Sequence, residues 1–217
     1  MKINAFTKSY GKKRVLNFPG IELENGIIYA VIGANGSGKS TFAKIIAGIE
    51  KADGNLTAID GCHIGYMPQK SFAFNKTVKG NVLLNGKNET RAEMLIDVFG
   101  LKDLSNSNAK KLSGGETARM ALARLMMKYY DIVILDEPTA SMDMESTLIS
   151  ENQIKNYCKE TKCALILITH SLQQAKRIAD NVIYFEKGEL VEIGCATDVL
   201  NSPKKVETKT FLDFYGL

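Results

Sequence analysis

The first residues whose types and spacing suggest chemistry form one short run: Gly33, Ala34, Asn35, Gly36, Ser37, Gly38, Lys39, Ser40 and Thr41. Glycines let the backbone curl so that successive N–H groups point inward at phosphate oxygens, and a helix beginning near the lysine adds its positive dipole end. In such a loop Lys39 reaches the β- and γ-phosphates, and the Ser40 hydroxyl ligates Mg²⁺. The run therefore predicts a site for a nucleoside triphosphate.

A pair of carboxylates follows the apolar run DIVIL. Asp136 ends this run, and it suits a carboxylate that holds Mg²⁺ through water. Glu137, one residue further, can polarise the water that attacks the γ-phosphate. Taken alone, the two carboxylates have a less favoured alternative, which is to cap a turn before Pro138. Beside a phosphate loop, they predict hydrolysis of the bound triphosphate.

A second glycine pair opens the stretch LSGGETARMALARLMM. Ser113, Gly114, Gly115 and Glu116 have the S-x-x-E pattern of a capping box, which is one explanation for the stretch. However, each glycine costs about 1 kcal/mol against alanine inside a helix, so a plain cap has no use for two. Bare N–H groups at a helix start suit a closely approaching phosphate. One nucleotide would then be held between two chains, by Lys39 of one chain and this segment of the other.

Three apolar runs must position these groups. Residues 26–33 (GIIYAVIG), 131–138 (DIVILDEP) and 163–170 (CALILITH) are predicted as strands buried on both faces of a parallel sheet, whose polar ends meet at one edge. After the phosphate loop, STFAKIIAGI has apolar residues at helical spacing, which predicts a helix over residues 40–49. The sheet and this helix would thus carry the phosphate loop and both carboxylates.

The other segments predict an inserted lobe and further strands. Between Gln69 and Ser113 the sequence lacks strand-like runs and is typical of helices with polar breaks. The N-terminal MKINAFTKSY and VLNFPGIELENG alternate like antiparallel strands, and IYFEKGELVEIG predicts a hairpin around Lys187 and Gly188, with a short helix from about Thr197. We therefore expect one α/β domain over residues 1–217. Its mostly parallel sheet core and antiparallel β lobe would occupy residues 1–69 and 114–217, and its helical lobe about 70–113.

The composition excludes several classes of protein. The net charge of +4, from 28 basic and 24 acidic residues, is too small to argue for nucleic-acid binding. No apolar run approaches the roughly 18 residues of a membrane helix, and the N-terminus lacks the apolar core of a secretory signal. The cysteines lack metal-ligand spacing, so reduced thiols in the cytoplasm are expected at Cys62, Cys158, Cys163 and Cys195.

Taken together, the motifs resemble those of the nucleotide-binding subunit of an ATP-binding cassette (ABC) transporter, over nearly the whole chain. GANGSGKST is similar to the family's Walker A motif, YMPQ to its glutamine loop, LSGGE to its signature, VILDEPTA to its Walker B motif, SMD to its D-loop and ITHS to its switch histidine, all in the family's order. The resemblance implies the P-loop ABC ATPase fold, ATP and Mg²⁺ as cofactors, and two cassettes that sandwich two ATP molecules head to tail. The signature residues 113–116 would then complete the partner's ATP site.

The resemblance also implies roles for single residues. Tyr10 would stack on adenine, and Gln69 would touch Mg²⁺ or the attacking water and sense the transporter. His170 would contact the γ-phosphate, and Asp143 would bridge the dimer interface. His63 has no such match and is expected on the surface. The implied catalytic residues are Lys39, Glu137 and His170, and the implied Mg²⁺ ligands are Ser40, Gln69 and Asp136.

Three departures from the family pattern affect these roles. Glu116 stands where glutamine is commonest, which keeps the capping box. ASMDM replaces the usual Ser-Ala-Leu-Asp-Pro, so a looser D-loop backbone is expected. Ser171 follows His170 where aspartate is usual, which weakens the inference about how the histidine is oriented. The segment over residues 54–69 is short, which predicts a trimmed antiparallel lobe.

The implied partners are a second copy of the chain or a paralogous cassette, together with separate membrane-spanning subunits that would dock near residues 69–81. The chain would then be cytoplasmic and peripheral on the inner face of the cell membrane. FAFNKTVKGNV resembles the corresponding run in importers of small solutes, of the tungstate, molybdate or amino-acid type, which favours import. Two alternatives remain: a soluble ABC-type ATPase acting in translation or DNA maintenance, and a solitary P-loop kinase or switch.

Overall fold

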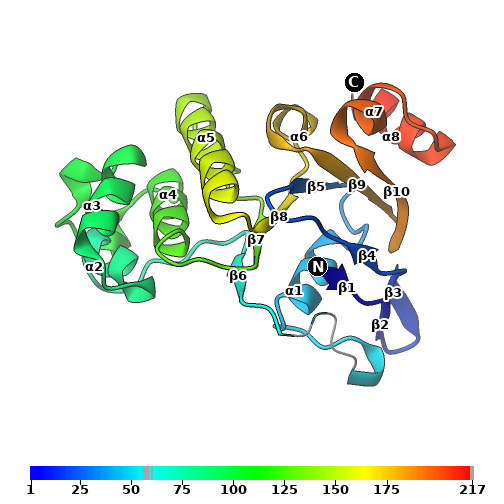
Figure 1. Cartoon of the computed structure of the whole chain (residues 1–217), viewed down its shortest axis with the longest axis horizontal. Helices are drawn as coiled ribbons and strands as arrows, with labels where there is room; N and C mark the ends of the chain where they lie inside the picture. Colours follow the sequence, from blue (N-terminus) through cyan, green and yellow to red (C-terminus); the bar gives the residue numbers. More distant parts are fainter. Residues whose placement is uncertain (56–58, 60, 216–217) are drawn as a thin grey trace.

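A mostly parallel sheet forms the centre of the molecule (Figure 1). In the part of the chain that this computed structural model describes, residues 1–55, 59 and 61–215, the sheet has eight strands. In sheet order they are β2 (Phe6–Tyr10), β3 (Lys13–Phe18), β10 (Glu189–Cys195), β9 (Asn181–Glu186), β5 (Ile28–Ile32), β8 (Ala164–Ile168), β7 (Ile132–Asp136) and β6 (Ile64–Met67). The predicted α/β class with a mostly parallel sheet is confirmed.

The strands predicted over residues 26–33, 131–138 and 163–170 are β5, β7 and β8, and they are adjacent and parallel in the sheet. Every residue of these strands is buried. Continuous burial explains why their sequences are unbroken apolar runs rather than alternating ones. The carboxyl ends of the three strands meet at one edge, as expected, and the phosphate loop starts there.

Antiparallel strand pairs form near both ends of the chain. Near the N-terminus, β2 pairs with β3, and β1 (Lys2–Ile3) pairs with β4 (Ile21–Glu22) in a small separate sheet. Near the C-terminus, β9 and β10 form the predicted hairpin, and Lys187 and Gly188 turn it with φ of 50° and 83°. The Gly188 N–H donates to the Ser37 oxygen at 3.0 Å, and a Cβ at Gly188 would lie 2.4 Å from the Val15 oxygen. The hairpin turn is therefore wedged between the phosphate loop and β3.

The predicted helical segment between Gln69 and Ser113 contains α2 (Val78–Val82) and α3 (Glu89–Val98), with the 3₁₀ turns η2 (Leu83–Asn85), η3 (Lys102–Leu104) and η4 (Ala109–Lys111). Residues 102–112 were expected to be helical, but η3 and η4 are all that forms there. The Asn108 side chain accepts the Lys110 N–H at 2.9 Å, and such local bonds compete with a continuing helix.

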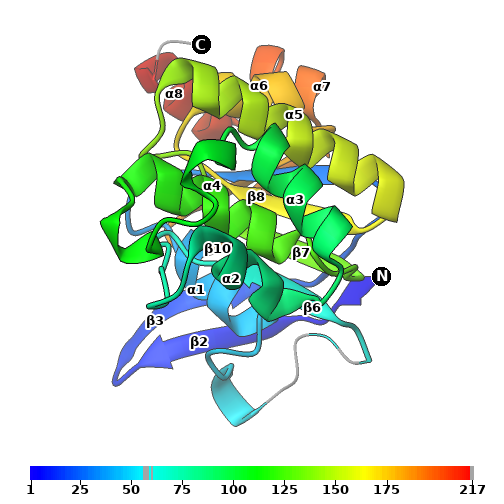
Figure 2. The same cartoon turned by 90° about the vertical axis from the view of Figure 1, so that its left-hand side faces the viewer.

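The next helix, α4 (Gly114–Leu125), joins these helices to the sheet, because it packs on α2, α3 and β6. Figure 2 is viewed from the side of these helices and shows α2, α3 and α4 in front of the strands. The boundary of the helical lobe at about residue 113 stays a prediction.

The remaining helices are α1 (Lys39–Ile46), η1 (Asp53–Asn55), α5 (Met144–Thr161), α6 (Leu172–Ile178), α7 (Ala196–Asn201) and α8 (Val206–Tyr215). The helix expected over residues 40–49 ends at Ile46, before Gly48 with its φ of 70°, so Ile49 is exposed rather than on a buried helix face. The short helix expected near Thr197 is α7, and α8 follows it. Among the described residues, no helix is both long and apolar enough to span a membrane.

Aromatic packing fixes α1 on the sheet. The Phe42 ring lies 4.8 Å from that of Phe18 and 5.1 Å from that of Phe185, centroid to centroid, and 6.5 Å from that of Phe6. Phe42, Phe18 and Phe185 are fully buried or nearly so. Such buried aromatic pairs contribute beyond their area alone. The helix that follows the phosphate loop is thereby held rigidly against β3 and β9.

Candidate nucleotide-binding and catalytic site

The predicted phosphate loop leaves β5 and turns directly into α1. Gly33, Gly36 and Gly38 have φ of 148°, 78° and 103°, in the region that favours glycine. A Cβ at Gly33 would lie 2.2 Å from the main-chain oxygen of Phe185, so the close approach of the loop to β9 requires a glycine. The loop thus has the tightly curved backbone that a cradle of N–H groups needs.

Lys39 extends its side chain back over the start of the loop. Its ammonium donates to the Gly33 oxygen at 2.7 Å and to the Ala34 oxygen at 2.9 Å. Burial lowers the pKa of this ammonium, and the carboxylates of Glu137 and Asp136 oppose that shift. A buried cation that can exchange two carbonyl partners for phosphate oxygens favours an anionic ligand.

Asp136 offers a carboxylate oxygen that lacks a partner. The residue is 3% exposed, and burial raises the pKa of its carboxyl, while a hydrogen bond with the Ser40 side chain opposes the shift. Its Oδ1 has no hydrogen-bond partner among the described residues. A buried, unpartnered carboxylate oxygen is costly unless a cation reaches it. Together with the Ser40 hydroxyl, it fits a hard cation with oxygen ligands, such as Mg²⁺.

Glu137 lies one residue beyond β7 in a left-handed backbone conformation, with φ of 52°, which costs a non-glycine residue about 1 kcal/mol. Its N–H donates to the Ile168 oxygen at 2.9 Å and so ties the strained residue to β8. Its carboxylate lies 2.6 Å from Nδ1 of His170, whose side chain is 63% exposed. A carboxylate held this firmly suits a general base.

Most of the predicted site residues line one open hollow of about 280 Å³. Its walls come from Tyr10, Val15, residues 35–41, Gln69, Asp136, Glu137 and Ile168. Gly33 and Ala34 lie at the start of the loop, under the Lys39 ammonium, and His170 joins the group through Glu137. Val15, within β3, and Ile168, at the end of β8, were not predicted, since apolar residues of strands carry no distinguishing signal. The arrangement can hold a polyanion beside a fixed carboxylate.

Tyr10 forms the rim of this hollow and is 52% exposed. Its hydroxyl donates to the carboxylate of Glu50, and Nζ of Lys8 lies 5.1 Å from the centre of its ring. Stacking of this ring on adenine stays a prediction. Nothing in the sequence pattern singled out Glu50.

The signature residues lie at the start of α4, apart from the residues that line this hollow. The Glu116 N–H donates to Oγ of Ser113 at 3.3 Å, and the Ser113 N–H donates to the Glu116 carboxylate at 2.7 Å. The capping box is therefore formed. Ser113 and Gly114 are exposed, so the cap leaves the front of the helix accessible to a ligand held by another chain.

Gly115 packs closely against the loop after β7 of its own chain. A Cβ at Gly115 would lie 2.9 Å from the Ser141 oxygen, whereas one at Gly114 would make ordinary contact at 3.4 Å with the Ser141 Cβ. Packing within the chain is thus a second reason for glycine at position 115, and a role of Gly115 toward a partner's ligand stays a prediction. Asp143 caps α5 by accepting the Ser146 N–H at 2.7 Å, and its place in a dimer interface stays a prediction.

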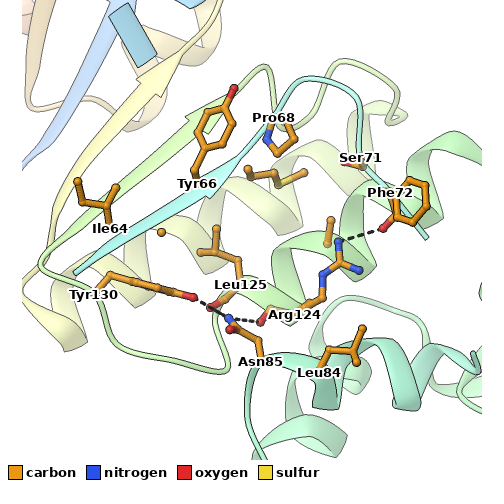
Figure 3. Close-up of a pocket in the computed structure, with 13 residues that line it drawn as sticks. Ile64, Tyr66, Pro68, Ser71, Phe72, Leu84, Asn85, Arg124, Leu125 and Tyr130 are labelled. Atoms are coloured by element: carbon orange, nitrogen blue, oxygen red, sulfur yellow. Dashed lines mark hydrogen bonds between the residues drawn. The ribbon is translucent and has the colours of Figure 1, made fainter. Parts of the chain in front are cut away.

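A second hollow, of about 310 Å³, lies between β6, the 3₁₀ turn η2 and α4 (Figure 3). Arg124 crosses it and donates to the Phe72 oxygen at 3.0 Å, while Leu84 is 47% exposed beside it. Pro68 lines this groove and Gln69 lines the nucleotide hollow, so one short segment borders both. The groove walls are residues 64–68, Ser71, Phe72, Leu84, Asn85, Ala121, Arg124, Leu125 and Tyr130.

Sequence comparison places the chain among known proteins. Residues 16–140 match the family model described as "ABC transporter". The tungstate uptake system ATP-binding protein TupC of Peptoclostridium acidaminophilum is 36% identical over 205 residues, which cover 88% of this chain and 96% of that protein. The arginine transport ATP-binding protein ArtM of Bacillus subtilis is 32% identical and covers 98% of both chains.

Solved structures share the fold at lower identity. One described as the ATP binding subunit of an ABC transporter superposes with a TM-score of 0.84 and 21% identity, over 98% of each chain. The dimeric structure of MJ0796, a bacterial ABC transporter cassette, superposes with a TM-score of 0.79 and 23% identity, over 90% of this chain and 98% of that one. The fold found here is thus the fold of these cassettes.

Proposed function

Because the chain belongs to the ABC transporter family and is an ATP-binding cassette with ATPase activity, we propose that it powers import of a small solute through separate membrane subunits. The observation that carries this proposal is the hollow in which the phosphate loop, Asp136 and the Glu137–His170 contact meet. A bare phosphate site would not need a fixed carboxylate beside it. Hydrolysis does.

Mg²⁺ is part of the proposal. Ser40 and Asp136 would hold it, with Gln69 lining the same hollow, because the buried Oδ1 of Asp136 has no hydrogen-bond partner in the described part of the chain. When bound, the ion neutralises charge on the β- and γ-phosphate oxygens. Burial raises the pKa of the Asp136 carboxyl, and a cation bound beside it would oppose that shift.

Lys39, Glu137 and His170 would have different roles in hydrolysis. Lys39 exchanges its two carbonyl acceptors for phosphate oxygens, and an ammonium has three donors for this purpose. Glu137 accepts the proton of the attacking water, which its position beside the phosphate loop allows. His170 orients that carboxylate through Nδ1 and leaves its exposed edge for the γ-phosphate.

A second copy of the chain, or a paralogous cassette, would complete each ATP site. The exposed Ser113 and Gly114 lie outside the hollow of their own chain, so the hollow they serve belongs to a partner. The similarity to a dimeric cassette structure supports this pairing. Gly115 meanwhile holds the start of α4 against Ser141, so the signature and the D-loop of one chain would move together.

Membrane subunits would dock in the groove beside β6. It is mostly apolar and exposes Leu84 and Phe72, and it borders the Gln69 segment through Pro68. A helix that presses on this groove can therefore displace a residue of the nucleotide hollow. Docked in this way, the cassette would lie on the inner face of the membrane as a peripheral subunit.

Relatives support the import direction and the size of the solute. TupC is named for tungstate uptake and ArtM for arginine transport, and a 32% identical protein of Campylobacter jejuni is named for phosphate import. The solute of this chain would therefore be a small ion or an amino acid. The alternative, a soluble ABC-type ATPase, is not favoured by these names.

The test is reconstitution of the cassette with candidate membrane subunits. ATP hydrolysis by the purified cassette should be slow, and it should rise in proteoliposomes and respond to the transported solute. Tungstate, phosphate and arginine are the first solutes to try. Full activity of the cassette alone, with no response to any membrane partner, would instead favour the soluble ATPase.

A further inference from the structure

The edge strand β2 is tied to the segment that follows α1. The Ser9 N–H and hydroxyl donate to the Asp53 carboxylate at 3.1 and 3.0 Å, and the Thr7 hydroxyl donates to it at 3.2 Å. Nζ of Lys8 donates to the Lys51 oxygen at 2.7 Å. Consecutive residues of one strand are thus bound to one short segment, residues 50–53.

The same segment holds Tyr10 through Glu50. The Tyr10 hydroxyl donates to Oε1 of Glu50, and Nζ of Lys8 lies 3.2 Å from that same oxygen. Lys8 also lies over the Tyr10 ring, 5.1 Å from its centre. The hydrogen bond from Tyr10 lowers the pKa of the Glu50 carboxyl, so the acceptor is ionised near neutral pH.

These contacts hold the ring from outside the nucleotide hollow. Tyr10 and Val15 line that hollow, whereas Lys8 and Glu50 do not. One face of the ring is therefore occupied by the Lys8 ammonium, and the ring still presents a wall to the hollow. An aromatic face beside a phosphate site can stack on a base.

Glu50 also belongs to the rigid unit that carries the phosphate loop. Its N–H donates to the Lys44 oxygen at 3.1 Å, so it continues from the end of α1. The other end of α1 begins at Lys39, next to the loop glycines. The offset between the Tyr10 ring and the phosphate loop is thereby set through α1.

From this geometry we propose that Glu50 is a positioning residue for the nucleotide base: with Lys8, it holds the Tyr10 ring where a base stacks once the triphosphate fills the loop. The proposal rests on the proposed function, since it requires nucleotide binding in this hollow. An unheld tyrosine at 52% exposure would turn freely and would lose ordering entropy on binding. Because Glu50 already holds the ring in the free protein, less entropy is lost when the nucleotide binds.

Two ligands separate the base from the phosphates: ATP and inorganic tripolyphosphate. Glu50→Ala should raise the Kd for ATP about tenfold, part of the value of one stacked base, and leave the Kd for tripolyphosphate unchanged. Lys51→Ala is the matched control, because Lys51 is exposed and contacts Lys8 through its main chain. Isothermal titration calorimetry measures both constants.

Tyr10→Phe keeps the ring and removes the same hydrogen bond without touching α1. It should weaken ATP binding, but by no more than Glu50→Ala, which also breaks the Lys8–Glu50 ion pair. The double variant should bind ATP no more weakly than Glu50→Ala, because both changes remove the same Tyr10–Glu50 hydrogen bond. This variant decides the question if Glu50→Ala does not fold.

Two results would overturn the inference. One is ATP binding by Glu50→Ala and Tyr10→Phe equal to wild type, and the other is an equal loss of tripolyphosphate binding, which would place the effect in α1. Either result leaves wild-type ATP hydrolysis and the proposed function intact. Failure of the wild-type chain to bind ATP at all would overturn both.

Discussion

The carboxylate of Glu137 and Nδ1 of His170 lie 2.6 Å apart, although 33 positions separate them in the chain. Their strands are neighbours, and Asp136 pairs with Ile168 at the end of the β7–β8 ladder. The residues just beyond both strands therefore meet at the carboxyl edge of the sheet. The register of two buried strands thus fixes where a carboxylate and an imidazole come together.

Glu137→Gln should bind ATP with unchanged affinity and lower its turnover by at least ~10²-fold, because the amide cannot accept the proton of the attacking water. ATP binding and phosphate release measure the two properties separately. Glu145→Gln, at an exposed carboxylate in the first turn of α5, is the control and should behave as wild type. Turnover near the wild-type value in Glu137→Gln would remove this residue from the mechanism.

Asp136 should make the stability of the ligand-free protein depend on pH. Burial raises its folded-state pKa above the unfolded value near 4, so the native state binds more protons, and stability falls as pH rises through that window. Asp136→Asn removes the titrating group. The free energy of unfolding of the variant, relative to wild type, should therefore increase from about pH 4 toward pH 7 in urea titrations without nucleotide or Mg²⁺. A difference that is independent of pH contradicts the prediction.

Complementation tests whether one ATP is shared between two chains. The Lys39→Ala variant cannot bind phosphate through its own lysine, but its signature segment is intact. The Ser113→Arg variant keeps its phosphate loop, but its signature segment is blocked by the arginine. Each variant alone forms homodimers with both sites damaged, whereas the mixture forms a heterodimer with one intact site. The mixture should therefore hydrolyse ATP when neither variant does so alone, as phosphate release will show.

The alternative hypothesis, that Ser113 serves only in the capping box, predicts a different result for the same variants. If Ser113 acts only as a cap, Ser113→Arg loses roughly 1 kcal/mol of stability and still hydrolyses ATP unaided. Sedimentation of each chain and of the mixture, in the presence of ATP, provides a second readout. Activity of Ser113→Arg alone, with no gain on mixing, would disprove the shared site.

Leu84→Asp should reduce the stimulation of hydrolysis by membrane subunits, because it replaces an exposed apolar side chain of the groove in Figure 3 with a charge that a docked apolar surface would have to desolvate. Met94→Asp is the matched control, since Met94 is 52% exposed on α3 and lies outside the groove walls. ATPase activity in proteoliposomes, compared with that of each variant alone, measures the effect. Equal stimulation of both variants would place the docking surface elsewhere.

The sequence was most informative where one physical cause dominates. Unbroken apolar runs predicted β5, β7 and β8, because only strands buried on both faces have such runs. The phosphate loop was predicted because Gly33, Gly36 and Gly38 have positive φ, and this preference for glycine is local to the backbone. The hairpin at Lys187 and Gly188 was predictable for the same reason.

Features that depend on distant partners were not predictable. Strand β6 was not predicted, because it contains Gly65 and glycine is uncommon in strands. A distant contact requires this glycine, since a Cβ at Gly65 would lie 2.8 Å from the Tyr130 ring. The packing role of Gly115 was not predicted, because its neighbour Ser141 lies in another segment. Ser171 replaces the family's usual aspartate, yet it accepts the Gln174 N–H and caps α6, which no pattern around His170 revealed.

The close packing of Gly188 between Ser37 and Val15 has a consequence for synthesis of the chain on a ribosome. Every residue of the phosphate loop has been made by Thr41, but the strand and turn that support its curved backbone, β9 and residues 187–188, come from the last fifth of the chain. A nascent chain that ends before Asn181 would carry the complete nucleotide motif without this support. The order of these elements along the chain therefore predicts that a nascent chain gains its full affinity for ATP only after β9 and the turn at Gly188 have been made.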